Sequence, residues 1–266
     1  MSTELISPLA VIEEGAIIGE NVKIDAFAFV SGQSKIGSGT TIAHGACIYG
    51  KTTIGENNRI FSHAVIGSIP QDLKFNGEDV ELVIGDNNTI REFTLFNPGT
   101  AGGGSVTRIG SNNLFMGYVH LGHDVIIGDN CILANAATLA GHVELGDHVV
   151  IGGMTPIHQF CKIGSFSMVG GGSVLTQDLP PFCMAEGNRA KLRGLNLTGL
   201  RRNLEKSEIN PLRAAYKELF ERGRPLAEAA EELANTTESK SVKELAMFVL
   251  ATKRGINFDR AQSKLD

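Results

Sequence analysis

The 266-residue chain is long enough to bury a full core and to hold one large domain or two small ones. Its 32 glycines, its lack of tryptophan and its 6 % aromatic content indicate an aliphatic core and a backbone that turns often. A formal net charge of −5 gives no sign of a nucleic-acid-binding protein.

The lack of a recognisable secretion signal and the spacing of the cysteines favour a reducing compartment. The N-terminus lacks the basic flank and apolar core of a secretion signal, and no aliphatic run approaches the roughly 20 residues of a membrane span. The four cysteines, at positions 47, 131, 161 and 183, form no C-x-x-C pair and no zinc-ligand spacing. We therefore expect a cytoplasmic protein with reduced thiols and without stable membrane insertion.

A six-residue aliphatic repeat begins at Ile12. Every sixth residue from Ile12 to Ile66 is isoleucine or valine, in ten positions without a miss. The same phase resumes in three positions from Ile84 to Phe96, then shifts by one residue and runs through twelve positions from Ile109 to Leu175. This period fits neither a helix nor an alternating strand, and hexapeptide repeats are typical of a parallel β-helix.

The repeat predicts where side chains lie. The aliphatic residue of each hexad fills the interior, and the position two residues earlier holds a compact inward residue, such as Ala28, Cys131 or Cys161. Glycine often follows the aliphatic residue, which we attribute to a tight corner that disfavours a Cβ atom. Three hexads close one triangular coil, so residues 18 apart stack about 4.8 Å from each other.

Two insertions interrupt the repeat. Between Ile66 and Ile84 the expected aliphatic positions hold Asp72 and Glu78, so residues 67–83 are predicted to leave the solenoid as a first insertion. The second insertion is the segment from Asn97 to Ser105, which is rich in glycine. Solenoids tend to carry function on such segments.

Helices are predicted after the hexads end, near Leu175. The expected boundaries are a Ser207 cap and a Gly223 end for the first helix, Pro225 at the start of the second, and a Ser241–Glu244 capping box for a third that ends near Gly255. The predicted fold is therefore mainly β, with a parallel β-helix over residues 1–188 and a C-terminal α-helical domain over residues 189–266.

The 18-residue coil makes a local prediction around His123. Gly141 is predicted to lie beside His123 on the next coil, and His142 beside Asp124. His123 follows the inward Leu121 by two residues, so it lies on the outer surface. A histidine beside an accessible backbone N–H suits acyl transfer, because the imidazole removes a proton from the nucleophile and the N–H stabilises the oxyanion.

Two other interpretations of these histidines remain. An exposed histidine is most often a solvated surface residue, but four of the seven histidines fall close together, at positions 120, 123, 142 and 158. Three imidazoles can also hold zinc, as in carbonic anhydrases built on hexapeptide solenoids. The histidine and aspartate beside a glycine are explained without a metal, so we predict neither a metal nor a cofactor.

Basic residues follow the solenoid. Between Gly187 and Leu204 the sequence contains Arg189, Lys191, Arg193, Arg201 and Arg202 and no acidic residue. Both a solvated face and a site for phosphate or for an acidic carrier protein are compatible with this run.

Four motifs identify a family. They are Ile69-Pro-Gln-Asp-Leu-Lys74, His120-Leu-Gly-His-Asp124, Ala134-Asn-Ala-Ala-Thr-Leu-Ala-Gly-His142 and Ile151-Gly-Gly-Met-Thr-Pro-Ile-His-Gln159. With them the chain resembles the UDP-N-acetylglucosamine O-acyltransferases over essentially its whole length. The resemblance implies a left-handed β-helix, an exception to the right-handed crossover rule, and a homotrimer with active sites between subunits. It also implies transfer of a (3R)-hydroxyacyl chain from acyl carrier protein to the 3-position of UDP-N-acetylglucosamine, the first step of lipid A biosynthesis.

The resemblance also implies roles for single residues. His123 is the implied general base, Asp124 orients its imidazole, and Gly141 N–H holds the oxyanion. Gly171 is the position that sets acyl length. The implied substrate contacts are Gln71, Asp72, Lys74, His120, His142, His158 and Gln159 for the sugar and phosphates, and Asn196 and Arg202 for the nucleotide.

One departure from the family concerns the acceptor. Where many members carry Ile-His-Arg-Gly-Thr, this chain has Phe96-Asn-Pro-Gly-Thr100. Some relatives with an altered loop here resemble forms that acylate the 3-amino sugar and make an amide. Amide formation therefore remains an alternative, as does a scaffold solenoid that catalyses no reaction.

Overall fold

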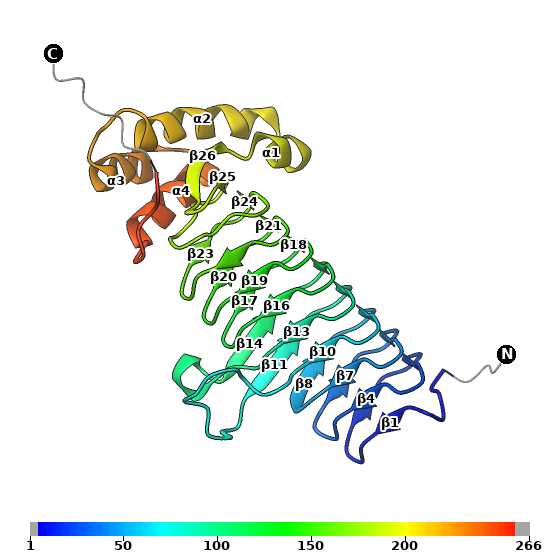
Figure 1. Cartoon of the computed structure of the whole chain (residues 1–266). Helices are drawn as coiled ribbons and strands as arrows, with labels where there is room; N and C mark the ends of the chain where they lie inside the picture. Colours follow the sequence, from blue (N-terminus) through cyan, green and yellow to red (C-terminus); the bar gives the residue numbers. More distant parts are fainter. Residues whose placement is uncertain (1–4, 259–266) are drawn as a thin grey trace.

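The chain forms a long triangular solenoid with a bundle of helices at its C-terminal end (Figure 1). This computed structural model describes residues 5–258. The outermost residues of the predicted ranges 1–188 and 189–266 lie outside the described part.

Three sheets make the faces of the solenoid, and they are parallel except for their last strand pair. The first contains β1 (Val11–Ile12), β4 (Phe29–Val30), β7 (Cys47–Ile48), β10 (Val65–Ile66), β13 (Leu95–Phe96), β16 (His120–Leu121), β19 (Thr138–Leu139) and β22 (Pro156–Ile157). The second contains β2 (Ile17–Ile18), β5 (Lys35–Ile36), β8 (Lys51–Ile54), β11 (Glu81–Ile84), β14 (Val106–Ile109), β17 (Ile126–Ile127), β20 (Glu144–Leu145) and β23 (Lys162–Ile163). The third contains β3 (Lys23–Ile24), β6 (Thr41–Ile42), β9 (Arg59–Ile60), β12 (Thr89–Ile90), β15 (Leu114–Phe115), β18 (Ile132–Leu133), β21 (Val150–Ile151), β24 (Met168–Val169), β25 (Cys183–Glu186) and β26 (Lys191–Leu195).

Strand register confirms the predicted length of a regular coil. Along the regular coils each strand pairs with the strand three hexads later, as Leu121 pairs with Leu139. From Ile24 to Leu175 every interior residue of the repeat is at most 4 % exposed. Burial of one such side chain contributes about 1.5–3 kcal/mol, so the repeat itself builds the core of the solenoid.

The two insertions account for the changes of phase in the repeat. Ile66 pairs with Phe96, so this coil contains twelve residues more than a regular coil of 18. Because twelve is a multiple of six, the phase of the repeat does not change. Phe96 in turn pairs with Leu121, and the seven added residues of the next coil shift the phase by one.

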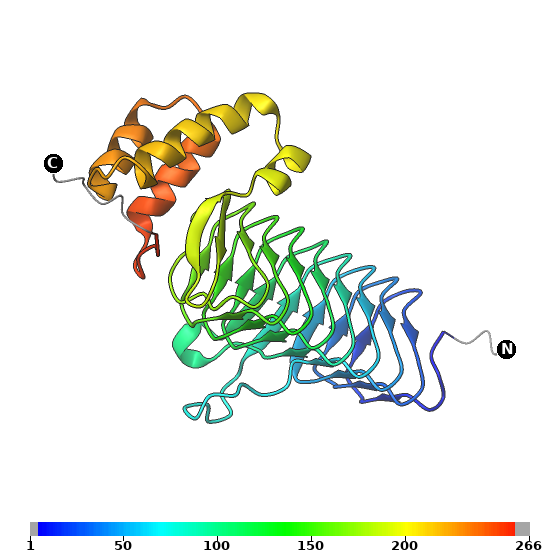
Figure 2. The ribbon, with the colours of Figure 1, turned by 45° about the horizontal axis from the view of Figure 1, so that its top comes forward.

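The bounds of the insertions differ slightly from those predicted. The first insertion covers residues 67–80 and is shorter than predicted, because β11 rejoins the solenoid at Glu81. The second insertion covers residues 97–105 as predicted and contains the 3₁₀ helix η1 (Ala101–Gly103). The first insertion protrudes from the solenoid beside η1 in both views (Figure 2).

The prediction that a Cβ atom is disfavoured at these glycines is confirmed, but the reason given, a tight corner, was wrong for most of them. Most glycines that directly follow an interior residue, such as Gly37 and Gly128, do not have a left-handed backbone, and Gly67, with φ of 81°, is the exception. A Cβ atom at Gly37 would lie 2.4 Å from the carbonyl carbon of Gly55 on the next coil, so these glycines allow close stacking. The left-handed residues lie two positions later and are often asparagine, such as Asn130 with φ of 59°.

The solenoid also continues past the predicted end of the hexads. Leu179 pairs with Ile163, and β25 adds a parallel strand to β24. Val169 pairs with Ala185, so this last coil is shorter than the regular ones and falls out of the six-residue pattern. β26 then turns back and pairs antiparallel with β25.

Four helices follow in the described part of the chain. They are α1 (Leu197–Asn203), α2 (Lys206–Phe220), α3 (Leu226–Thr236) and α4 (Lys240–Ala251). The three predicted helices correspond to α2, α3 and α4, with α3 beginning directly after Pro225 as predicted. The short α1 was not predicted. None of the helices in residues 5–258 is long and apolar enough to cross a membrane.

Two of the predicted helix caps were wrong. Glu205, not Ser207, is the N-cap of α2. Ser239 is the N-cap of α4 and accepts a hydrogen bond from the N–H of Val242. The Ser241 hydroxyl instead donates to the Glu208 carboxylate at 2.8 Å, so it joins α4 to α2.

The buried cysteines are core residues, as predicted. Cys131 and Cys161 are fully buried and free. Burial raises the pKa of the Cys131 thiol to about 12 and that of Cys161 to about 11, so both thiols stay protonated and unreactive at neutral pH.

Candidate active site

His123 and Asp124 lie on the corner that joins β16 to β17. Asp124 takes the left-handed corner position, with φ of 59°, and its backbone N–H donates to Thr107 Oγ1 at 2.8 Å. His123 Nδ1 lies 2.8 Å from Asp124 Oδ2. Because an ionised carboxylate only accepts hydrogen bonds, the imidazole proton belongs on Nδ1, and Nε2 keeps its lone pair.

Gly141 lies beside His123 on the next coil, as the 18-residue rule predicts. The N–H of His142 donates to the carbonyl oxygen of His123 at 3.0 Å, which fixes the two coils side by side. A Cβ atom at Gly141 would lie 2.6 Å from His123 Nε2, so only glycine leaves room for this imidazole. Within residues 5–258 the Gly141 N–H has no acceptor. Gly141 is buried in the single chain, and its N–H is therefore an unpaired donor beside the His123 imidazole.

His142 forms the other side of this cluster. Its ring stands edge-on to His123, with centroids 5.0 Å apart, and stacks on Phe160 at 4.4 Å. His142 Nε2 lies 3.8 Å from Asp124 Oδ2. Burial lowers the pKa of His142 more than the Asp124 carboxylate raises it, so the ring is neutral at pH 7 and can offer or accept a hydrogen bond.

A pocket of about 530 Å³ brings the two insertions to this cluster. Two predicted residues of the first insertion, Asp72 and Lys74, line it together with His142. Other residues that line it were not predicted, and these are Asn76, Glu78, Thr100, Ala101, Gly102 and Phe160. Two carboxylates, one ammonium and one imidazole around one cavity suit a polar substrate that offers hydroxyl groups and a negative charge near Lys74.

Comparison with known proteins agrees with this site. A family model described as UDP N-acetylglucosamine O-acyltransferase, domain 2, matches residues 178–257, and a model of bacterial transferase hexapeptide repeats matches residues 107–141. Relatives from Sulfurimonas denitrificans and Aliarcobacter butzleri are 70 % and 67 % identical over 96 % of this chain and 98 % of their own length. Both relatives are named acyl-[acyl-carrier-protein]--UDP-N-acetylglucosamine O-acyltransferase.

A solved structure of UDP-N-acetylglucosamine acyltransferase from Campylobacter jejuni is 52 % identical, with a TM-score of 0.92 over 96 % of this chain and 100 % of that one. The chain belongs to the UDP-N-acetylglucosamine O-acyltransferase family. The fold of this O-acyltransferase is therefore the predicted left-handed parallel β-helix with a C-terminal helical part.

Three other predicted residues of the O-acyltransferase do not line the 530 Å³ pocket. Gln71 is exposed on the first insertion. His120 is half-buried on β16, and burial lowers its pKa. Gln159 is exposed one coil beyond Gly141.

His158 lies in a second cavity, of about 810 Å³, at the C-terminal end of the solenoid. Arg189 and Arg254 also line this cavity, and Arg254 Nη2 lies 3.2 Å from His158 Nδ1. None of its described lining residues is acidic. The cavity is therefore suited to an anionic group, and the structure separates His158 from the pocket that contains His142.

The remaining predicted residues lie away from His123 in the single chain. Gly171 is exposed on a different corner, where a Cβ atom would be 3.5 Å from Gly153 O and so would fit. Asn196 is the N-cap of α1, with its side chain accepting from Gly199 N–H and donating to Phe166 O. Arg202 is exposed in the last turn of α1. One chain alone does not bring these residues to the imidazole.

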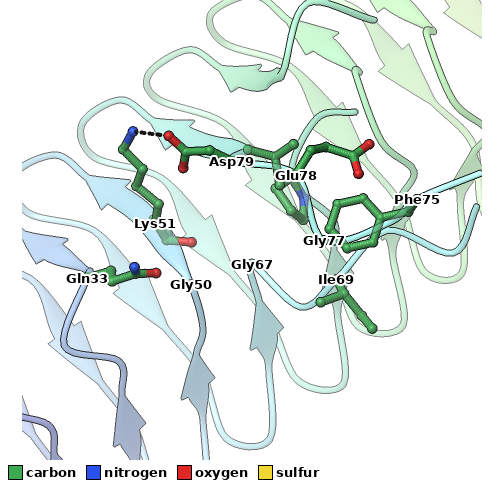
Figure 3. Close-up of a pocket in the computed structure, with 12 residues that line it drawn as sticks. Gln33, Gly50, Lys51, Gly67, Ile69, Phe75, Gly77, Glu78 and Asp79 are labelled. Carbon is green, nitrogen blue, oxygen red and sulfur yellow. Dashed lines mark hydrogen bonds and ion pairs between the residues drawn. The ribbon is translucent and has the colours of Figure 1, made fainter. Parts of the chain in front are cut away.

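A third pocket, of about 400 Å³, lies on the other side of the first insertion (Figure 3). Lys51 Nζ lies 3.3 Å from Asp79 Oδ2 at the rim of this pocket, and Phe75 and Ile69 form an apolar wall. It contains none of the predicted site residues, and its lysine is already paired with acidic groups. We therefore assign the chemistry to the pocket beside His142.

Sequence reasoning missed the threonines that surround Asp124. Thr100, in the second insertion, and Thr107, on β14, both bond to this residue. The predicted 18-residue spacing does not reach Thr100, because the insertion breaks the register. The available signals were its place in a glycine-rich segment that interrupts the repeat and the Gly-Thr pair that this segment shares with many family members.

Proposed function

We propose that this chain transfers a (3R)-hydroxyacyl group from acyl carrier protein to the 3-position of UDP-N-acetylglucosamine, the first step of lipid A biosynthesis. The observation that carries the proposal is the arrangement around His123: Nδ1 is held by Asp124, and Nε2 lies beside Gly141, whose N–H is unpaired in the described part of the chain. Membership of the O-acyltransferase family supports the choice of substrates.

The geometry supports a direct transfer. His123 Nε2 removes the proton of the sugar 3-hydroxyl as its oxygen attacks the thioester carbonyl and a C–O bond forms. The tetrahedral oxyanion accepts a hydrogen bond from Gly141 N–H. When the oxyanion collapses, the C–S bond breaks and the imidazolium returns its proton to the departing thiolate. Asp124 stabilises the imidazolium, and the reaction needs no cofactor besides the carrier thioester.

The pocket residues are proposed to hold the acceptor. Lys74 supplies a cation for the phosphates, and Asp72 and neutral His142 supply hydrogen-bonding groups for the sugar. The basic cavity with Arg189 and Arg254 is proposed to serve the anionic donor.

Replacement of His123 tests the mechanism. His123→Ala removes the base and should lower kcat by about 10²–10⁴-fold with purified carrier thioester and UDP-N-acetylglucosamine. His148→Ala is the control, since His148 is another corner histidine of the solenoid but stacks on Phe166 and does not line the pocket. Near-normal turnover by His123→Ala would reject the mechanism. A product mass that fits the amide, formed only with the 3-amino acceptor, would change the assigned acceptor.

A zinc site is the second candidate, because ligand atoms of His123, Asp124 and His142 all lie within 4.8 Å of one another. However, both carboxylate oxygens of Asp124 already accept hydrogen bonds from protein groups, so a metal would compete with them. Metal analysis of the purified protein separates the two proposals. Stoichiometric zinc that is lost in His123→Ala would favour the metal mechanism.

We also propose that the active protein is a homotrimer with each site between two subunits. Asn196, Arg202 and Gly171 lie away from His123 within one chain, and a neighbouring subunit would supply them. A row of contacting rings on another corner, in which Phe27, Phe93 and Tyr118 are each at least half exposed, offers apolar surface for subunit contact.

Subunit mixing tests this arrangement. Trimers reconstituted from His123→Ala and Arg202→Ala chains should regain activity, up to roughly a quarter of wild type by random assortment, because some sites combine the intact half of each chain. Each variant alone should stay inactive. No recovery in verified mixed trimers would place both residues in one subunit's site, and full activity of Arg202→Ala would remove Arg202 from it.

A further inference from the structure

The second insertion covers the carboxylate of Asp124. Thr100, directly before η1, donates its backbone N–H to Asp124 Oδ1 at 2.9 Å and its hydroxyl to Oδ2 at 2.6 Å. Thr100 is 6 % exposed and Asp124 is 5 % exposed, so these bonds are shielded from water. Hydrogen bonds to a buried carboxylate are among the stronger ones in proteins.

Three donors fix the orientation of this carboxylate. Oδ2 accepts from both the Thr100 hydroxyl and His123 Nδ1, while Oδ1 accepts from Thr100 N–H. The Asp124 backbone is fixed as well, because its N–H donates to Thr107 Oγ1. Rotation of the carboxylate would therefore break at least two bonds to Thr100 where little water is available to replace them.

The close approach of η1 depends on Gly103. A Cβ atom at this position would lie 2.0 Å from Asp124 Cγ, which no side chain can tolerate. The backbone of η1 therefore packs directly on the carboxylate, and Thr100 takes the place that solvent would otherwise occupy.

The start of the second insertion is itself anchored. Asn97 is 1 % exposed and donates from Nδ2 to Ser68 O at 3.0 Å and to Ile69 O at 3.1 Å, so the two insertions are joined at their bases. Thr100 follows closely in the same segment, which limits how far its side chain can move from Asp124.

We propose that Thr100 is a positioning residue for the general base and acts on His123 through Asp124. Its two donors hold Oδ2 where it accepts the imidazole proton, which keeps Nε2 free, and they limit how strongly the carboxylate attracts the imidazolium. The kinetic part of this inference rests on the proposed function of His123, whereas the effect on the imidazole itself does not.

Thr100→Val tests the inference, because it keeps the shape and the backbone N–H and removes only the hydroxyl. We expect kcat to fall about 10–100-fold with KM values of both substrates within about twofold of wild type. A carboxylate that has lost a donor attracts the imidazolium more strongly, so the acid limb of the kcat/KM profile should move to higher pH. Thr100→Ser should restore both values. Thr100→Ala serves as a second variant should Thr100→Val fail to fold.

Thr94→Val is the matched control. Thr94 is 1 % exposed, and its hydroxyl has no partner among the described residues. The substitution is chemically the same and should leave kcat and the pH profile unchanged. A shift of equal size in Thr94→Val would reduce the role of Thr100 to general packing.

A spectroscopic measurement separates this inference from the proposed function. In ¹⁵N-histidine-labelled protein without substrate, the His123 signals, assigned by their loss in His123→Ala, should show the Nδ1-protonated tautomer, and Thr100→Val should mix in the other tautomer. This result stands even if the protein does not turn over the carrier thioester. Thr100→Val with unchanged tautomer and unchanged pH profile, or with a raised KM alone, would overturn the inference.

Discussion

Two corners of the same solenoid have the same backbone geometry and opposite uses. At the corner after β17, the second residue beyond the interior position is Asp129, and its N–H donates to the Asp147 carboxylate on the next coil at 2.8 Å. At the corner after β16, the equivalent residues are His123 and Gly141. Glycine offers no side-chain acceptor to the N–H of His123. Among residues 5–258, neither the N–H of His123 nor that of Gly141 has a hydrogen-bond acceptor.

The difference shows how a repetitive scaffold makes a site. A chain of acceptors closes the Asp129 corner: Ser111 N–H donates to Asp129, Asp129 to Asp147, and Asp147 to Ser165 Oγ. Each of these polar side chains is used to satisfy the neighbouring coil. At the His123 corner the chain of acceptors is broken by one glycine, so the imidazole and a backbone donor are left for a substrate.

Gly141→Ala should remove the difference between the two corners and have the largest effect on catalysis. The added Cβ atom would overlap His123 Nε2, so the base must turn away and the unpaired N–H is covered. We expect kcat/KM to fall about 10²–10³-fold, which is the range seen when an oxyanion donor is removed. Steady-state kinetics measure this loss, and circular dichroism checks the fold.

Gly117→Ala is the control for that substitution. Its Cβ atom would lie 3.2 Å from the end of the Asn135 side chain and at an ordinary contact distance of 3.5 Å from Glu92 O, and the site lies on another corner. Activity of Gly117→Ala should stay close to wild type. If Gly141→Ala were equally active, the space beside Nε2 would not matter for catalysis.

Asp147→Ala, at the other corner, should slightly lower stability and leave catalysis unchanged. It removes the acceptor of Asp129 N–H at an exposed position, where water replaces it, so the free energy of unfolding should fall by only about 0.5–1.5 kcal/mol. Acyl transfer should be unchanged. Urea unfolding measures the free energy of unfolding, and the turnover assay measures acyl transfer. Asp147→Asn should retain most of the stability because it keeps an acceptor.

Much of the site was predictable because the solenoid is periodic. The pairing of Leu121 with Leu139 carries His123 to Gly141 and Asp124 to His142, and this follows from the length of one regular coil. Where the structure departs from the six-residue repeat, the prediction of coil length and corner geometry was wrong. The shortened last coil and the left-handed corner residues were missed or misread, because both depend on how coils stack rather than on which residues are aliphatic.

The sequence by itself determined the solenoid, its core and the identity of the paired residues, because a strict six-residue repeat of buried side chains allows one register. Only the tertiary structure decided what surrounds Asp124. Thr100 comes from an insertion whose length breaks the period, so its approach to the carboxylate depends on the path of the loop, on the anchor at Asn97 and on the missing side chain at Gly103. Local sequence patterns do not encode contacts that a loop makes after it leaves the repeat.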